Sequence, residues 1–429
     1  MDGRFSVGSP AILGSERGRP FLTIESAKDG DMTSAGNAER TILVWVGVYL
    51  PGYKAGGPIK ALVHMVEQLG EQFTFKITTR DRDLGDSRPF ENVARGEWQQ
   101  VGNARVRYLQ PAELRPVGWR RLLRNVDCDL LYLNSFFDRQ TVFTLVLRRL
   151  GLVPRRPVLL APRGEFSAGA LSLKRVKKRA YLSLARRGGL LRGITLQASS
   201  EHEARDIAGS LTSMRRDMPR VVVAADLPGV SVPEQGGWSR PVKVPGEARL
   251  AFVGRIARMK NLDFALGLLE GIEGRVRFDV YGPIEDRSYF RECQRVQEGL
   301  TPNIQVVMRG LARSEVVHKA LGESHLLLMP SRGENFSHAI LEALTAGCPV
   351  LTSDRTPWRD LEASEAGWDI PLNRPEAFRE ALRRLMAMDQ GEFVRWSAGA
   401  AGRARAFRTD PAVLDASSRM LLGCLGVGD

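Results

Sequence analysis

The stretch Pro330–Glu342, with the sequence PSRGENFSHAILE, decides how the second half of this 429-residue chain folds. It follows HLLLM at residues 325–329, a short apolar run bounded by a turn signal, which predicts a buried strand. Beyond the polar residues 331–335, apolar residues return at helical spacing from Ser337 to Ala346 and predict a helix. The pattern therefore indicates a buried strand, a turn and the start of a helix.

Two carboxylates lie eight positions apart across this junction, Glu334 in the expected loop and Glu342 inside the expected helix. The backbone N–H groups of residues 335–339 would be the unpaired donors of the helix N-terminus, which favours a phosphate. Carboxylates beside such an anion site suit hydroxyl groups. The alternative is that Glu334 only complements the helix dipole and Glu342 lies on a solvated helix face. The residues expected to bind the ligand here are Asn335, Phe336, Ser337 and Glu342.

The sequence continues as ALTAGCPVLTSD at residues 343–354, where the helix is expected to close at Gly347 and a strand to follow. The whole run resembles the Glu-x7-Glu signature of retaining family-four (group 1) glycosyltransferases of the GT-B fold. TPWRDL at residues 356–361 is similar to one subgroup of that family, often met in surface-polysaccharide assembly. In that subgroup the positions of Ser337 and Arg355 commonly hold Gly and Gln.

The composition, 43% hydrophobic and 26% charged, predicts a soluble chain long enough for two ordinary domains. No apolar run approaches the roughly 20 residues that cross a bilayer, and the longest candidates, such as Thr41 to Leu50, are interpreted as buried strands. The five histidines form no ligand cluster in the sequence. The cysteines lack metal-ligand or redox spacing and are interpreted as reduced thiols of a cytosolic protein; they are Cys128, Cys293, Cys348 and Cys424.

Strands alternate with helices in both halves of the chain, which predicts two doubly wound, Rossmann-like α/β domains with the ligand site in the cleft between them. We expect a disordered extension over residues 1–40 and a first, acceptor-side domain over 41–228. A linker rich in Pro and Gly is expected over 229–247 and a nucleotide-sugar-binding domain over 248–408. The resemblance further implies that a C-terminal helix within 409–429 crosses back to the first domain.

The turn GRIARMKN at residues 254–261 follows the first expected strand of the second domain. Its cations Arg255 and Lys260 are expected to stabilise the negative charge that grows on a diphosphate as it leaves. The turn resembles the family's Gly-Arg-x4-Lys motif, which implies that both side chains lie on the donor diphosphate and that Gly254 contacts the donor. With Glu334 they are the expected catalytic residues. The alternative is a basic turn at the surface.

A glycine loop, PGYKAGGP at residues 51–58, follows the first strand of the first domain. The pair Gly56 and Gly57 allows the backbone to approach a ligand closely. The loop resembles the family's glycine loop, which implies contact with the donor phosphate and the acceptor. A plain strand-to-helix turn would use the same residues.

Two further loops of the first domain follow strands and supply the acceptor-side candidates Asn134, Arg163 and Glu165. Many family members have a histidine where this chain has Asn134. Its absence suggests that no base is needed there, in line with a retaining transfer in which the leaving phosphate accepts the acceptor's proton. That mechanism comes from the resemblance.

The formal net charge of +13 is concentrated between residues 111 and 200, which hold 18 Lys and Arg against 5 Asp and Glu. Within this stretch a helix over residues 171–187 is expected to carry its cations opposite an apolar face. It predicts either contact with an anionic membrane surface, at about 1 kcal/mol per cation, or a solvated helix face. No zinc-finger spacing or interleaved aromatic residues accompany the charge, so no nucleic-acid partner is predicted.

The pair of carboxylates in Asp81-Arg82-Asp83 has the spacing of a metal site, but cations already occupy the predicted phosphate site. We therefore predict no metal and no cofactor beyond a nucleoside diphosphate sugar as co-substrate. The predicted activity is retaining, metal-independent hexosyl transfer to a glycan or lipid-linked acceptor, in the cytoplasm or at the inner face of the cell membrane. Alternatives on the same fold are a nucleotide-sugar epimerase, a sugar phosphorylase and a catalytically silent sugar-nucleotide-binding module.

Overall fold

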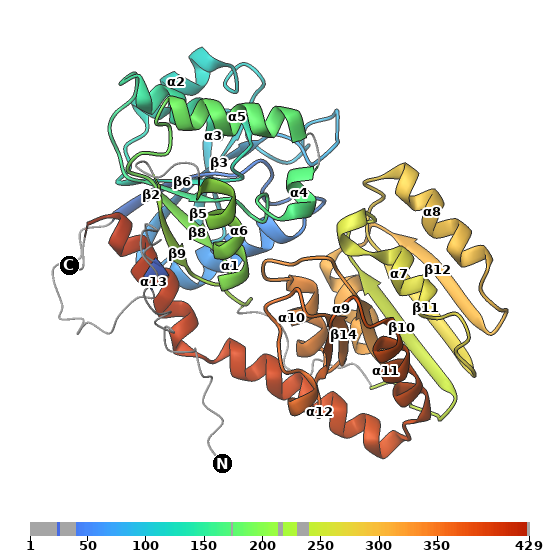
Figure 1. The fold of residues 1–429 in the computed structure, drawn as a ribbon. Helices are drawn as coiled ribbons and strands as arrows, with labels where there is room; N and C mark the ends of the chain where they lie inside the picture. The colour runs from blue at the N-terminus through green and yellow to red at the C-terminus, as the bar shows by residue number, and fades with distance from the viewer. Residues whose placement is uncertain (1–23, 26–39, 173–174, 213–217, 230–239, 427–429) are drawn as a thin grey trace, which may run out of the picture.

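The computed structural model describes residues 24–25, 40–172, 175–212, 218–229 and 240–426, which form two α/β domains side by side (Figure 1). Most of the extension expected over residues 1–40 and of the linker expected over 229–247 lies outside the described residues. Within the extension, Ile24–Glu25 is a two-residue strand, β1, that pairs with β9.

The first domain is built on a nine-stranded sheet with the order β1-β9-β8-β7-β6-β2-β3-β5-β4. Each neighbouring pair is parallel except β4 and β5, which are antiparallel. The central strands β6 and β7 are buried along their whole length and are apolar except for Asn134 at the end of β6, as parallel strands covered on both faces require. The strands are β2 (Arg40–Trp45), β3 (Phe73–Arg80), β4 (Trp98–Val101), β5 (Ala104–Leu109), β6 (Leu130–Asn134), β7 (Val158–Ala161), β8 (Thr195–Ala198) and β9 (Arg220–Val223).

Helices cover both faces of this sheet. One face packs on α1 (Gly57–Leu69) and α13 (Pro411–Cys424), and the other on α2 (Pro116–Asn125), α3 (Arg139–Arg149), α5 (Arg175–Arg187) and α6 (Glu201–Leu211). The single helix expected over residues 171–187 is two helices, α4 (Ala168–Ser172) and α5, and residues 173–174 between them lie outside the described part of the chain.

The second domain has a six-stranded, all-parallel sheet in the order β12-β11-β10-β13-β14-β15. Its strands are β10 (Glu247–Val253), β11 (Arg275–Tyr281), β12 (Ile304–Gly310), β13 (Leu326–Met329), β14 (Val350–Ser353) and β15 (Gly367–Ile370). Its helices are α7 (Leu262–Gly267), α8 (Arg287–Glu298), α9 (Ser314–Gly322), α10 (His338–Thr345), α11 (Pro375–Ala387) and α12 (Gln390–Arg408), with single-turn 3₁₀ helices at Arg258–Lys260 and Glu362–Ser364.

The C-terminal helices join the two domains (Figure 1). Trp396 and Ala400 of α12 belong to the core of the second domain. Met420 and Leu421 of α13 belong to the core of the first domain, and Ser418 Oγ donates to Gln72 Oε1 of that domain at 2.9 Å. The chain therefore ends on the domain in which the described part begins.

Each sheet has a point where the strand order reverses, between β2 and β6 in the first domain and between β10 and β13 in the second. The loops that leave these strands at their carboxyl ends are the usual place for a ligand in doubly wound folds. They are the glycine loop after β2, Asn134 at the end of β6, the turn at residues 254–261 after β10 and the loop at residues 330–337 after β13.

Candidate functional site

Lys260 and Glu334 meet where the loops after β10 and β13 lie side by side. The Lys260 Nζ atom is 2.5 Å from Glu334 Oε1, and their side chains are only 18% and 8% exposed. The Lys260 stem passes over Gly254, whose missing Cβ would lie 3.4 Å from it. The structure thus brings together two of the three predicted catalytic residues, together with Gly254.

The turn at residues 254–261 is fixed to the neighbouring loop by Asn261. This residue has a left-handed backbone with φ of 60°, which asparagine tolerates better than most residues. Its amide donates to Pro330 O at 3.0 Å and accepts from Arg332 Nε at 2.8 Å. Arg332 N also donates to Met259 O at 2.8 Å. These bonds hold the 3₁₀ turn that carries Lys260 against the loop that carries Glu334.

Arg255 lies elsewhere. It forms an ion pair with Glu285 of the loop after β11, and its side chain is 52% exposed. The two loops are tied through their backbones, since Ile256 N donates to Pro283 O at 2.9 Å. Arg255 is therefore a solvent-facing cation in this structure, in contrast to Lys260.

Ser337 is the N-cap residue of α10 and has a left-handed backbone with φ of 67°. Its Oγ atom is buried and has no hydrogen-bond partner. The backbone N–H groups of residues 335–338 have no hydrogen-bond acceptor among the described residues. They are available to an anion, as expected. The side chain of Phe336 is different, because it packs against Trp358 and Phe407 in the core and is only 4% exposed. Phe336 can offer a ligand its backbone but not its ring.

Glu342 lies one turn further along α10 and is ion-paired with Lys60 of α1, in the other domain. His318 Nε2 of α9 lies 3.7 Å from the same carboxylate oxygen. Burial disfavours the charged form, but Lys60 and His318 outweigh it and lower the pKa of Glu342 to about 2. The alternative of a solvated helix face is wrong, since Glu342 is a buried carboxylate held between domains.

The glycine loop faces α10 from the first domain. Gly56 has φ of 65° and open space where a side chain would project, and His338 Cδ2 lies 3.6 Å from the position of a Cβ on Gly57. The loop is anchored by Asp83, which accepts from the backbone N–H groups of Tyr53 at 2.9 Å and Lys54 at 3.3 Å. Asp83 thus positions the loop.

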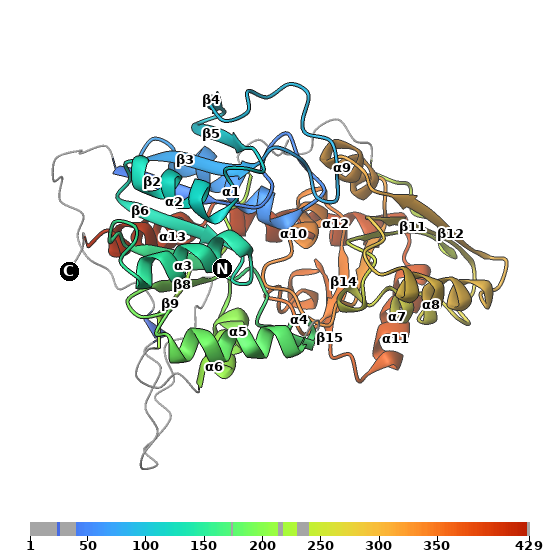
Figure 2. The ribbon, with the colours of Figure 1, turned by 90° about the horizontal axis from the view of Figure 1, so that it is seen from above.

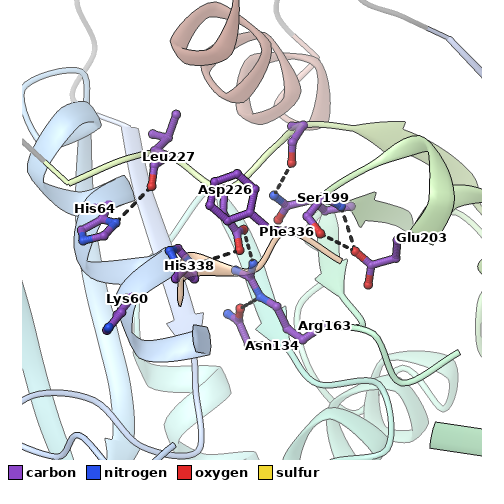
Figure 3. A network of polar contacts seen from close by, with 12 residues as sticks. Lys60, His64, Asn134, Arg163, Ser199, Glu203, Asp226, Leu227, Phe336 and His338 are labelled. Atoms are coloured by element: carbon purple, nitrogen blue, oxygen red, sulfur yellow. Dashed lines mark hydrogen bonds and ion pairs between the residues drawn. The ribbon is translucent and has the colours of Figure 1, made fainter. Parts of the chain in front are cut away.

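Arg163 lies at the centre of a buried network between the domains (Figure 3). Its Nε donates to Asn134 Oδ1 at 3.0 Å, its Nη1 to Asp226 Oδ1 at 2.6 Å and its Nη2 to Tyr132 OH at 2.9 Å. Burial opposes its charge, but Tyr132 and Asp226 more than offset this effect and raise its pKa. All three guanidinium nitrogens already have protein partners. Arg163 therefore holds Tyr132, Asn134 and Asp226 in place on the predicted acceptor side.

Asp226 extends this network to the second domain, because its Oδ2 lies 3.3 Å from His338 Nε2. Burial opposes its ionisation, yet Arg163 and His338 lower the pKa of Asp226 to about 2. The His338 ring also packs edge-on to His64 of α1 and to Phe336. A carboxylate, a guanidinium and two imidazoles therefore bridge the domains beside the glycine loop.

Glu165 follows β7 and holds the neighbouring loop after β6 by hydrogen bonds. Its carboxylate accepts from Ser135 Oγ at 2.6 Å and from the backbone N–H groups of Phe136 at 2.5 Å and Phe137 at 3.0 Å. Burial raises its pKa, although these hydrogen bonds act in the opposite direction. Both oxygens have protein partners, so Glu165 shapes the loop.

Sequence reasoning missed Lys60, His64, Asp226 and His318 as parts of the site. Lys60 carried a usable signal, because it sits one turn into the helix that follows the glycine loop. His64 lies one turn further along the same helix. Asp226 and His318 lie in segments without a motif, and only the folded chain brings them close to α10. Within the described residues, no group of three or more His, Cys, Asp or Glu side chains could hold a metal ion. No helix of the described chain is long and apolar enough to pass through a bilayer.

Most of the second domain matches a model of a known protein family. Residues 247–388 match the family described as glycosyl transferases group 1. A search of curated protein sequences found no match. The predicted resemblance to group 1 glycosyltransferases is confirmed for these residues.

Solved structures with the same fold cover nearly the whole chain. Sucrose-phosphate synthase from Thermosynechococcus elongatus aligns with a TM-score of 0.66 and 16% identity over 90% of this chain and 100% of its own. Anabaena HepE, solved with UDP and glucose, gives 0.60 and 14% over 89% and 100%. WaaG, a glycosyltransferase involved in lipopolysaccharide biosynthesis, gives 0.56 and 15% over 87% and 99%. At these identities the likeness establishes the fold, and the predicted GT-B architecture of two doubly wound domains is confirmed.

Proposed function

We propose that this chain, whose residues 247–388 form a group 1 glycosyltransferase domain, is a retaining, metal-independent hexosyltransferase that uses a nucleoside diphosphate sugar. The observation that carries the proposal is the Lys260–Glu334 pair beside the free backbone N–H groups that open α10. A cation and a helix N-terminus suit a diphosphate, and the adjoining carboxylate suits sugar hydroxyls. The UDP present in the structure of HepE supports a nucleotide donor.

We propose a role for each group. Lys260 and the N–H groups of residues 335–338 bind the diphosphate and stabilise the charge that develops on it as the bond to the sugar C1 breaks. Glu334 binds hydroxyls of the transferred sugar and keeps Lys260 in place. Arg255 reaches the diphosphate if it leaves Glu285, which its exposed position permits.

The acceptor hydroxyl oxygen forms the new bond to C1 on the face from which the diphosphate leaves, and its proton passes to the leaving phosphate oxygen. No side-chain base is needed for this balance. The Asn134 amide is consistent with this scheme, since it bonds to Arg163 and to Trp45 O and has no basic atom. Arg163 and Glu165 then shape the acceptor side through the loops that they hold.

Thermal stability against UDP, GDP, ADP and CMP, alone and as sugar conjugates, tests the proposal. A ligand at about a hundredfold excess over its Kd stabilises the folded state by about 2.7 kcal/mol. We expect one nucleotide series to stabilise the protein and its sugar conjugate to yield a product with retained anomeric configuration, in the presence of EDTA. Sugar conversion without an acceptor would identify an epimerase instead, dependence on inorganic phosphate a phosphorylase, and nucleotide binding without turnover a silent module.

A lipid-linked acceptor for surface polysaccharide, reached from the cytoplasmic side of the membrane, is the acceptor that we propose. Support comes from the outer face of α2, α3 and α5, which cover one side of the first sheet. Four large apolar side chains there are exposed by 60% or more: Val117, Leu150, Val176 and Leu184. The same three helices carry exposed cations, among them Arg121, Arg124, Arg149, Lys177, Arg179 and Arg186.

Polar contacts hold the parts of this basic apolar face together. Arg149 Nε donates to Gly188 O at 2.7 Å, which joins α3 to the end of α5, and Arg120 Nε donates to Leu152 O at 3.2 Å, which joins α2 to the loop after α3. A fixed surface that combines cations with exposed apolar side chains suits an anionic bilayer better than water. The anionic headgroups attract the cations, and the bilayer removes the apolar side chains from water.

Cosedimentation with lipid vesicles tests this part of the proposal. Binding is expected to vesicles containing about 30% phosphatidylglycerol and not to pure phosphatidylcholine, and to weaken with salt. The double variant Val176→Glu, Leu184→Glu should bind less, whereas Val316→Glu, an equally simple change at an exposed site on α9, should not. Equal binding to both vesicle types, or none at low salt, would refute the membrane contact.

A further inference from the structure

The loop after β7 joins the first domain to both loops of the proposed diphosphate site. At Gly164 a Cβ would lie 2.3 Å from Asn335 Nδ2, just before α10. At Gly169, in α4, a Cβ would lie 2.0 Å from Met259 Cε, in the turn that carries Lys260. Figure 2 shows α4 on the side of the first domain that faces the second. One loop of the predicted acceptor side therefore lies directly against both loops that are proposed to bind the diphosphate.

Asp226 adds a contact with the helix itself. It follows β9 in the first domain, where Arg163 Nη1 donates to its Oδ1 at 2.6 Å. Its Oδ2 lies 3.3 Å from Nε2 of His338, which is the first residue of α10. The side chains of Asp226 and His338 are only 10% and 8% exposed, so salt screens their interaction weakly. A buried carboxylate thus links the guanidinium of the predicted acceptor side to the helix whose N–H groups are proposed to bind the diphosphate.

His64 of α1 fixes His338 from another direction (Figure 3). The two rings pack edge-on with their centroids 5.7 Å apart, and His64 Nδ1 donates to the backbone oxygen of Leu227, next to Asp226, at 3.0 Å. The Nε2 atom of His338 is buried and has no hydrogen-bond partner among the described residues, so its 3.3 Å contact with Asp226 is not aligned as a hydrogen bond. Buried polar atoms are nearly always hydrogen-bonded, and a small rotation of α10 towards the first domain would give this atom its partner. The contact with Asp226 would therefore strengthen as the two domains approach each other.

We propose that Asp226 is a positioning residue for sugar transfer: by holding His338 it sets the start of α10, and with it the donor diphosphate, against the acceptor on the first domain. The inference rests on the proposed function, since it needs a sugar donor on one domain and an acceptor on the other. Lys260 and the N–H groups that bind the diphosphate belong to the second domain, so the contact with Asp226 changes donor affinity little. What it sets is the alignment of the acceptor oxygen with the sugar C1.

Alignment affects the chemical step more than it affects binding. Reacting atoms must approach to about 3–3.5 Å, and a misplacement of about 1 Å can lower the rate about a hundredfold. Loss of a contact between the domains also leaves C1 open to water, which then attacks in place of the acceptor hydroxyl and releases free sugar and nucleoside diphosphate. Without the contact, transfer should therefore fall and the share of donor that is hydrolysed should rise.

Variants of His338 test the inference without disturbing the Arg163–Asp226 pair. In His338→Asn the shorter amide cannot reach Asp226, so kcat for transfer should fall about a hundredfold while the Kd of the stabilising nucleoside diphosphate stays within about threefold. The hydrolysed share of the donor should rise, which a merely less stable protein would not show. His338→Gln, whose amide nitrogen reaches the position of Nε2, should restore transfer and suppress hydrolysis. His202→Asn is the matched control, because His202 lies 3.8 Å from Asp206 within a single helix, and it should behave like the wild type.

Circular dichroism establishes that each variant is folded, and His338→Leu, which also loses the polar group, takes the place of His338→Asn if that variant is not. Wild-type transfer in the folded variant, or a loss of transfer without more hydrolysis, overturns the inference and leaves the proposed function standing. A Kd that rises as much as transfer falls would also overturn it, because His338 would then act on donor binding. If the wild type transfers no sugar from any nucleotide donor, the proposed function fails first and the inference with it.

Discussion

Lys260 and Glu334, 74 residues apart in sequence, form a 2.5 Å ion pair at the reversal point of the second sheet. Each comes from a loop after one of the two adjacent central strands, β10 and β13, so the pair is fixed by the sheet itself. A site built on neighbouring parallel strands keeps its geometry when flexible surface loops move. The pair therefore offers a preorganised charge to a leaving group.

Lys260→Met should lower kcat by about a hundredfold to a thousandfold, the loss typical of one preorganised group that stabilises developing charge. Methionine keeps the apolar stem over Gly254 and removes the cation. Steady-state kinetics at saturating donor measures the effect, with Lys319→Met, an exposed lysine, as the matched control. A kcat within threefold of the wild type would exclude Lys260 from the chemistry.

Gly164→Ala should weaken donor binding through the contact between the domains. Gly164 has φ of 78°, and a Cβ there would collide with the Asn335 side chain across the domain boundary. Gly151→Ala is the matched control, because Gly151 has φ of 69° and open space around it. Both changes should cost about 1 kcal/mol through backbone strain. Only Gly164→Ala should raise the donor KM, and an equal KM in the two variants would contradict this prediction.

Ser337→Gly should stabilise the protein by about 1 kcal/mol in urea unfolding, because glycine accepts the left-handed backbone at φ of 67° and the change removes a buried, unpaired hydroxyl. Ser135 has a similar backbone, with φ of 75°, but its Oγ bonds to Glu165. Ser135→Gly should therefore gain nothing or lose stability. If the two variants change stability equally, strain at Ser337 is not relieved by glycine.

The sequence allowed the second-domain half of the site to be predicted because its information is local. A strand, a polar turn and a helix in succession place Glu334 in the loop at the start of α10, and the same logic places Lys260 in a turn after β10. Boundaries shifted by a few residues. The strand expected from Thr41 to Leu50, for example, ends at Trp45, where the chain begins the turns that lead into the glycine loop.

The contacts between the domains could not be predicted, because no local pattern records a distance between residues far apart in the chain. Lys60 and Glu342 are 282 positions apart, and Asp226 reaches His338 from a segment that carries no motif. For the same reason the functional interpretation of Arg163 and Glu165 was incomplete. Both follow strands, as ligand-binding residues do, but the fold surrounds them with protein partners.

Two buried histidines should make stability fall as the solution becomes mildly acidic. Burial, reinforced by His338, lowers the pKa of His64 to about 4, and burial also lowers that of His325 to about 4. A group whose pKa is lower in the folded state than its ordinary value of 6.5 contributes stability that is complete above pH 6.5 and is lost as pH falls towards 4. The reason is visible at His325, whose Nδ1 accepts from Arg249 N at 2.9 Å and cannot also hold a proton.

At pH 5 each histidine should lower the free energy of unfolding by about 2 kcal/mol relative to pH 7, which is the product of 1.5 pH units and 1.36 kcal/mol per unit. Urea unfolding of the wild type, His64→Gln and His325→Gln at several pH values measures the slope, with His202→Gln as a surface control. Both core variants should be less stable than the wild type at pH 7. Their free energy of unfolding should fall less between pH 7 and pH 5, because the unfolded variant no longer has that histidine to bind a proton. Asp226 and Glu342, with pKa values of about 2, should add their losses only as pH falls from about 4.5 towards 2. A wild type equally stable at pH 5 and 7 would show that the two histidines are charged in the folded protein.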